Sequence, residues 1–296
     1  MAKKRFDKRE RLRQIAEYAD RWLMTRQRNH IASIEIAIKE LERSIIDNLN
    51  RLLTTEGRLD TPKINFKIAQ KIHREIFNDF SSQFDPVVRA QIADFDNLLG
   101  MVERSYANFD EVLNFTSVDR KALNALKHGY LNKWIDLSGT KRNEVTQAMY
   151  NHVIGRQKFS RLVEVVQKNI YGADIPGVPG KSLAQQARLY ARDMLMNFHN
   201  ETIVTASENL DMNHFLYIGD IMSTTRDFCR KRAGRVYTRK QIDSWTYKWA
   251  GKSGPAMTHR GGYNCRHHWQ PMRPEWLDGE KRVDIANWDL ETREGG

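Results

Sequence analysis

The feature that most constrains the fold is the regular spacing of apolar residues in the first part of the chain. Between about Leu12 and Leu53, large apolar side chains recur at steps of three and four, which places them on one face of an α-helix. A helix of about 40 residues is about 60 Å long, well beyond the average in globular domains. We therefore expect it to pack lengthwise on other helices or on another chain. The residues of this stripe are Ile31, Ile34, Ile38, Leu41, Ile45, Leu49 and Leu52.

Turn and capping residues divide the next stretch into further helices. Gly57 is expected to end the first helix. Thr61 and Pro62 predict a second helix, with Thr61 as the N-cap and Pro62 at the first helical position. Asp85 followed by Pro86 has the same pattern and predicts that another helix begins there.

The helical pattern continues to about residue 208. Ser117 predicts a helix that ends before Gly139, and the next is expected from about Arg142 to Ile154. Another covers residues 157–171 and stops at Gly172. Ser182 is expected to cap a last long helix, which precedes a short strand over residues 214–218.

A glycine- and proline-rich segment suggests a domain boundary. Residues 172–180 contain three glycines and two prolines in nine positions, which excludes regular structure and is typical of a linker or a long loop. We expect a helical domain over residues 1–172, a linker or flexible loop at 173–181 and a C-terminal domain over 182–296. The predicted fold is mainly α, with an elongated helical N-terminal region and a small α+β C-terminal head.

Charge and cysteine content narrow the class of protein. The net charge of +11 and the pI near 9.6 favour an acidic partner such as nucleic acid, an anionic protein face or an anionic membrane surface, although a well-charged soluble surface explains them equally well. Two cysteines do not make a disulfide framework and indicate a reducing compartment. The sequence contains no run of about 18 apolar residues, so it predicts no membrane span.

Both cysteines lie in the C-terminal head, together with clustered histidines. Thiolate and imidazole ligands bind zinc tetrahedrally, so a zinc ion could stabilise this small head. The alternative is two small buried thiols with histidines that hydrogen-bond to the backbone. A cysteine nucleophile with a histidine base is also conceivable, but no sequence signature places the two in contact, and we expect no enzymatic activity. The candidate zinc ligands are Cys229, Cys265, His259 and one of His267 and His268.

Basic and aromatic residues alternate in the same head. This composition is typical of nucleic-acid contact. It is equally typical of a small domain with an aromatic core and arginines at its rim or interface. The basic residues that could contact nucleic acid or a protein partner are Arg226, Arg230, Lys231, Arg232, Arg235, Arg239 and Lys240.

The order of these residues carries a resemblance to a known family. An aspartate follows a helix, and then come a Thr-Arg…Cys segment, a Gly-x-x-Tyr turn, a histidine and a Cys-Arg pair near a proline. Residues of about 180–275 thereby resemble the C-terminal domain of phage minor head proteins of the Mu protein F and SPP1 gene product 7 type. The matching positions are Asp220, Thr225, Arg226, Cys229, Gly234, Tyr237, His259, Cys265, Arg266 and Pro271.

The resemblance implies a structural role. Such a protein would be made in the host cytoplasm and become part of the virion, in the capsid interior or at the portal vertex. It would bind portal, major capsid or scaffold protein during head morphogenesis and could be oligomeric in the virion. It could also contact double-stranded DNA or travel with it on ejection. Two other hypotheses stay open: an enzyme or toxin-like head that uses the Cys/His cluster, and a free-standing DNA-binding protein.

Overall fold

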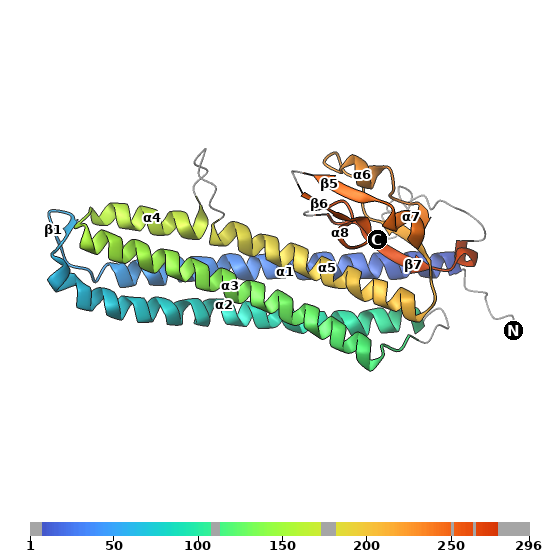
Figure 1. Ribbon diagram of the computed structural model, residues 1–296, viewed down its shortest axis with the longest axis horizontal. Coiled ribbons are helices and arrows are strands. Elements are labelled where there is room, and N and C mark those ends of the chain that lie inside the picture. Colours follow the sequence, from blue (N-terminus) through green and yellow to red (C-terminus); the bar gives the residue numbers. More distant parts are fainter. Residues whose placement is uncertain (1–7, 108–112, 173–181, 250–251, 263–264, 278–296) are drawn as a thin grey trace, which may run out of the picture. The chain divides into compact units, whose positions relative to one another are not determined.

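The fold is mainly α, with a long helical N-terminal region and a small sheet-containing C-terminal part, as the sequence predicts (Figure 1). We describe a computed structural model of the chain over residues 8–107, 113–172, 182–249, 252–262 and 265–277. The proposed linker at 173–181 lies outside these residues. No helix in the described ranges combines the length and the apolar character needed to cross a membrane.

The helical region consists of five helices and one short hairpin. The hairpin, β1 (Thr54–Thr55) and β2 (Arg58–Leu59), connects the first two helices. The helices are α1 (Lys8–Leu49), α2 (Pro62–Ala107), α3 (Ser117–Ile154), α4 (Phe159–Tyr171) and α5 (Leu183–Asn209).

Several predicted boundaries are confirmed. The helical stripe of the first forty residues forms the single helix α1, and Pro62 is the first residue of α2. Gly172 ends α4 with a positive φ of 77°, and its N–H bonds to the Lys168 carbonyl. The Ser182 hydroxyl accepts from the Gln185 N–H and so caps α5.

Three predictions about breakers are wrong. Helix α1 ends at Leu49, and Gly57 instead forms the β1–β2 turn with a φ of 73°. Pro86 lies inside α2, and Gly139 lies inside α3. A glycine inside a helix costs only about 1 kcal/mol, and even the larger cost of an internal proline is offset when apolar residues on both sides are buried. Phe84 and Val88 are buried around Pro86, and Leu137 and Val145 around Gly139.

The cap of α3 also differs from the prediction. Thr116, and not Ser117, is the capping residue, because its hydroxyl accepts from the Asp119 N–H at 3.2 Å. The Asp119 carboxylate accepts in return from the Thr116 N–H at 2.8 Å. This reciprocal pair is the capping-box arrangement.

Residue contacts divide the chain into two compact units. One unit falls within residues 27–93 and 128–191, and the other within 1–26, 94–127 and 192–296. This division differs from the one expected from the sequence, since α1, α2, α3 and α5 each contribute to both units. The boundary at 173–181 therefore remains a prediction about the chain.

The first unit is held by the apolar faces of its helices and by a buried polar contact. Ile45, Ile76 and Met149 are fully buried. The Trp134 indole N–H donates to the Gln91 side-chain carbonyl at 2.9 Å, which satisfies a polar group that would otherwise be costly in the core.

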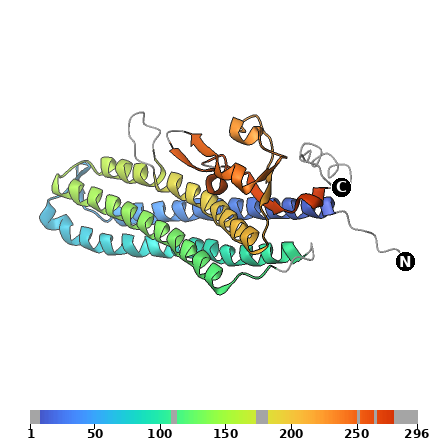
Figure 2. The same ribbon diagram turned by 45° about the vertical axis from the view of Figure 1, so that its right-hand side comes forward.

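The second unit contains the C-terminal part. Its three-stranded antiparallel sheet has the order β4 (Val236–Thr238), β3 (His214–Ile218), β7 (His268–Met272). The strands β5 (Thr246–Trp249) and β6 (Lys252–Pro255) form a separate pair (Figures 1 and 2). The short helices α6 (Asp227–Arg230), α7 (Arg239–Asp243) and α8 (Ala256–His259) and the 3₁₀ helix η1 (Pro274–Leu277) complete it.

Polar contacts connect this part to the helices of the same unit. The guanidinium of the buried Arg260 donates to the Met196 carbonyl and to the Asn197 side chain of α5, each at 3.0 Å. The Gln270 amide of β7 donates to the Tyr106 hydroxyl of α2 at 3.2 Å. The C-terminal part is therefore anchored on α2 and α5, and its buried core carries the candidate site.

Candidate metal centre

Tyr217 of β3 lies at the centre of the site. All four residues after His214 in β3 are buried, so both faces of this central strand are covered. Tyr217 pairs with Trp269 of β7, and their rings are 4.3 Å apart. The ring of His267 lies nearly parallel to that of Tyr217 at 5.3 Å, and Phe228 meets it edge-on at 6.3 Å. This aromatic packing fixes the direction in which the Tyr217 hydroxyl projects.

The two cysteines meet at that hydroxyl. Cys229 comes from α6 and Cys265 from the segment just before β7, and their sulfurs are 3.6 Å apart. The Tyr217 oxygen is 3.3 Å from the Cys229 sulfur and 3.7 Å from the Cys265 sulfur. Nδ1 of His267 is 3.9 Å from the Cys265 sulfur. Both thiols are free and buried.

Glycines make the close approach of these side chains possible. A Cβ on Gly219, whose φ is 146°, would lie 2.7 Å from Cγ of His267. A Cβ on Gly261 would collide with the Cys229 sulfur and lie 3.2 Å from the Cys265 sulfur. The Arg226 guanidinium donates to the Gly261 carbonyl at 2.9 Å and holds this backbone in place.

Burial and proximity control the protonation of the thiols. The hydrogen bond with Cys265, together with burial, raises the pKa of the Cys229 thiol. The same hydrogen bond, assisted by His267, lowers the pKa of Cys265 well below its usual value. Burial raises the pKa of Tyr217 well above its usual value, and the two sulfurs add to the effect. The two shifts have opposite directions because the two sulfurs share one hydrogen bond.

The donor set can hold a metal ion. The ligand atoms of Cys229, Cys265 and His267 all lie within 4.8 Å of one another. Two thiolates and an imidazole are soft to borderline donors, which favour zinc over calcium or magnesium.

The other two predicted ligands lie elsewhere. His259 lies in α8, and its side chain is exposed. Its ring lies against Gly254 and is not part of the cysteine group. Nδ1 of His268 is 3.7 Å from an Asp20 carboxylate oxygen, and its ring meets that of His199 at 5.3 Å. His267 and His268 point away from each other because they are adjacent residues at the start of a strand, where successive side chains alternate.

The buried histidine pair is held in its neutral form. Burial lowers the pKa of His268 to about 3, and the neighbouring Arg260 and His267 add to this shift. Burial likewise lowers the pKa of His199 well below its usual value, with further contributions from His268 and Arg260. These imidazoles serve as part of the packed core and not as members of the cysteine group.

A pocket opens beside the cysteine group. It has a volume of about 130 Å³, and both Cys229 and His267 contribute to its wall. Asp220, Arg226 and Arg266 also line it. An ion bound between the two thiols would therefore lie next to a small polar opening.

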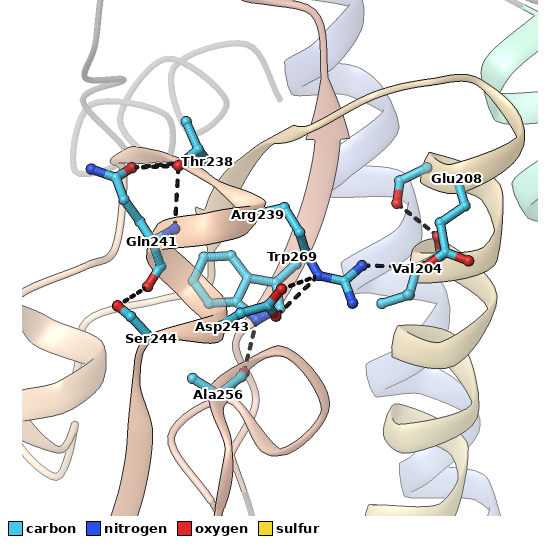
Figure 3. Close-up of polar contacts among 10 residues, drawn as sticks. Val204, Glu208, Thr238, Arg239, Gln241, Asp243, Ser244, Ala256 and Trp269 are labelled. Atoms are coloured by element: carbon cyan, nitrogen blue, oxygen red, sulfur yellow. Dashed lines mark hydrogen bonds and ion pairs between the residues drawn. The ribbon is translucent and has the colours of Figure 1, made fainter.

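Four of the predicted basic contact residues already make polar or ring contacts within the second unit. Arg226 donates to Gly261 as described, and Arg230 donates to the Met222 and Thr225 carbonyls at 3.1 Å each. The guanidinium of Arg232 lies between two rings, 3.9 Å from the centroid of Phe228 and 4.2 Å from that of Trp245. Arg239 forms ion pairs with Asp243 and Glu208 (Figure 3).

The remaining three basic residues face solvent. Lys231, Arg235 and Lys240 are exposed, and within the described part of the chain their side chains make no hydrogen bond or ion pair. The basic set therefore separates into arginines that make contacts within the C-terminal part and three cations that are available to a partner.

Figure 3 also shows two local contacts in the C-terminal part. Thr238 and Gln241 bond reciprocally in the capping box of α7, and the Trp269 indole N–H donates to the Ala256 carbonyl.

Sequence reasoning missed Tyr217 as a member of the site. The available signal was weak: a tyrosine in a short apolar strand, two residues before Gly219. Only strand pairing with Trp269 and packing on Phe228 show where its hydroxyl points.

Comparison with known proteins gives no match: no protein-family model, curated protein or solved structure is significantly similar to this chain.

Proposed function

We propose that this chain is a structural component of a phage head, a minor head protein whose C-terminal module is stabilised by a zinc ion on Cys229, Cys265 and His267. The observation that carries the proposal is the convergence of the residues that resemble the minor-head-protein pattern. Cys229 and Cys265 are 36 positions apart in the sequence, yet their sulfurs are 3.6 Å apart.

The other pattern residues support the same centre. Arg226 holds the Gly261 carbonyl directly beside the two sulfurs. The ring of Tyr237 meets that of Trp245 edge-on at 4.7 Å and that of Trp269 at 6.4 Å, in the core that surrounds Tyr217. Arg226 and Tyr237 thus help to hold the C-terminal part together, as a structural role requires.

Zinc is the ion that the donor set favours. Structural zinc sites use cysteine and histidine ligands in tetrahedral geometry, and their binding energy adds directly to folding energy. The small sheet and its short helices bury one cluster around Phe215, Tyr217 and Trp269. A zinc ion would connect α6 to the segment before β7 and restrain this cluster.

The partners follow from the same proposal. The long helices provide extended faces for a portal, major capsid or scaffold protein, and the net charge of +11 suits a protein enclosed with packaged DNA. For DNA contact, the exposed Lys231, Arg235 and Lys240 are the favoured residues. Replacing each by Gln should reduce the slope of log K against log salt by about 0.9 for every phosphate that the variant no longer neutralises. An unchanged slope in the triple variant would remove this surface from the proposal.

The assignment to the phage head is tested on particles. Proheads and mature particles of the phage or prophage that encodes this chain would be purified and analysed by quantitative mass spectrometry. We expect the chain in proheads at a fixed ratio to the portal protein, and we expect portal antibodies to co-precipitate it. Its absence from particles, while it is abundant in the same lysate, would exclude a virion role.

A further inference from the structure

The Tyr217 hydroxyl occupies a position that no hydrogen-bonding role explains well. Its ring is fully buried, and among the described residues the hydroxyl has only the two cysteine sulfurs as polar partners, at 3.3 Å and 3.7 Å. A thiol is a weak donor and a weak acceptor, so these contacts satisfy a buried phenol poorly.

We propose that Tyr217 is the fourth ligand of the ion, so that Cys229, Cys265, His267 and the Tyr217 phenolate form a closed tetrahedral centre. This inference rests on the zinc centre of the proposed function. It adds Tyr217 to the ligands, sets the coordination number at four and requires that the phenol loses its proton when zinc binds.

The sulfur–sulfur and oxygen–sulfur distances agree with the edges of a tetrahedron. With metal–sulfur bonds of about 2.3 Å and metal–oxygen bonds of about 2.0 Å, the edges are about 3.8 Å between two sulfurs and about 3.5 Å between sulfur and oxygen. The observed sulfur–sulfur separation is 3.6 Å, and the two oxygen–sulfur separations are 3.3 Å and 3.7 Å. The edge from Cys265 to Nδ1 of His267 is 3.9 Å.

Other donors in the second unit are less suitable. Asp20 and Asp220 line the neighbouring pocket, but neither joins the group whose ligand atoms lie within 4.8 Å. His268 faces Asp20 and His199, and His259 contacts Gly254. Tyr217 is therefore the donor best placed to complete four-coordination, since its oxygen contacts both sulfurs. A closed site is the form that structural zinc takes, whereas catalytic sites keep one position open.

The binding step involves protons and no electrons. Zinc(II) forms two bonds to sulfur, one to the imidazole nitrogen and one to the phenolic oxygen, while the thiols and the phenol lose their protons to solvent. No group is oxidised or reduced. If Tyr217 only donated a hydrogen bond to a ligating sulfur, its O–H bond would remain intact, and this difference can be measured.

The test is an ultraviolet difference spectrum during titration of the metal-free full chain with zinc. Wild type should develop the band of one tyrosinate per bound zinc. Tyr217→Phe should lack that band and bind zinc at least about tenfold more weakly. Tyr237→Phe is the matched control, because the Tyr237 ring packs on Trp269 in the same cluster and its hydroxyl makes no hydrogen bond to the described residues, so this variant should behave like wild type.

The outcomes separate the two proposals. Stoichiometric zinc binding by wild type without a tyrosinate band overturns the role of Tyr217 and leaves the zinc centre standing. Failure of wild type to bind zinc at all overturns both the zinc centre and the role of Tyr217, whereas the assignment to the phage head is decided by the particle analysis. Should Tyr217→Phe not fold, the wild-type spectrum alone decides, since the band is either present or absent there.

Discussion

Gly261 provides a direct test of how tightly the two cysteines are packed. In Gly261→Ala the new Cβ would collide with the Cys229 sulfur, lie 3.2 Å from the Cys265 sulfur and lie 3.8 Å from the Phe228 ring. Neither sulfur can retreat easily, because both cysteines are buried and they contact each other. Overpacking of a well-packed core costs about 1–3 kcal/mol. We therefore expect the free energy of unfolding to fall by about 2 kcal/mol.

The assay is thermal unfolding of wild type and variant, followed by circular dichroism in the presence and absence of zinc. A loss of about 2 kcal/mol corresponds to a fall in Tm of about 4–8 °C for a unit of this size. We also expect the variant to retain less zinc, since the added methyl separates the sulfurs.

Gly129→Ala is the matched control for the same chemical change. Gly129 lies inside α3, and an added Cβ would meet no atom within 4 Å. Alanine is favoured over glycine inside a helix by up to about 1 kcal/mol, so this variant should be more stable than wild type. The reasoning would be refuted if Gly261→Ala melted at the wild-type temperature and held the wild-type amount of zinc.

Two further predictions concern the core around the centre. Replacing Arg232 by Met removes a guanidinium that lies between the Phe228 and Trp245 rings, and we expect the unfolding free energy in urea to fall by about 1–2 kcal/mol. The control is Lys231→Met at an exposed position, which should lower it by less than about 0.5 kcal/mol. Equal effects of the two substitutions would contradict the ring contacts. The folded pKa of His268 is about 3 and that of His199 lies well below its usual value of 6.5, so the contribution of these neutral histidines to stability is complete above pH 6.5 and is lost as the pH falls below it. Below pH 6.5 the unfolding free energy should therefore decrease by about 1.4 kcal/mol per pH unit for each such histidine, and a flat profile between pH 7 and pH 5 would show that they are not buried neutral.

The sequence predicted the helices well and their interruptions poorly. The three- and four-residue spacing of apolar side chains defines α1 because that stripe is long and uninterrupted. Local breaker rules failed at Pro86 and Gly139, where burial of Phe84, Val88, Leu137 and Val145 outweighs a local penalty. Such burial depends on contacts between helices, which no single window of sequence contains.

The candidate site was predictable in residue type but not in geometry. The grouping of Cys229 and Cys265 with a histidine followed from their shared position in the C-terminal head. Which histidine joins them depends on strand alternation at the start of β7, which directs His267 to the sulfurs and His268 to Asp20. Tyr217 enters only through the pairing of β3 with β7.

The basic residues illustrate the same limit. A count of arginines and lysines in residues 226–240 predicts a contact surface but cannot distinguish cations that are already paired. Arg232 and Arg239 are used within the module, whereas Lys231 and Lys240 remain exposed. Their different fates depend on the aromatic rings and carboxylates that the fold brings beside them.

The most direct test of the central claim is the metal content of the purified full chain, measured by elemental analysis beside its Cys265→Ser variant. We predict about one zinc per chain in wild type and a strongly reduced amount in Cys265→Ser, with His259→Ala retaining the wild-type content. Folded wild-type protein without stoichiometric metal, or a Cys265→Ser variant that retains all of it, would contradict the account.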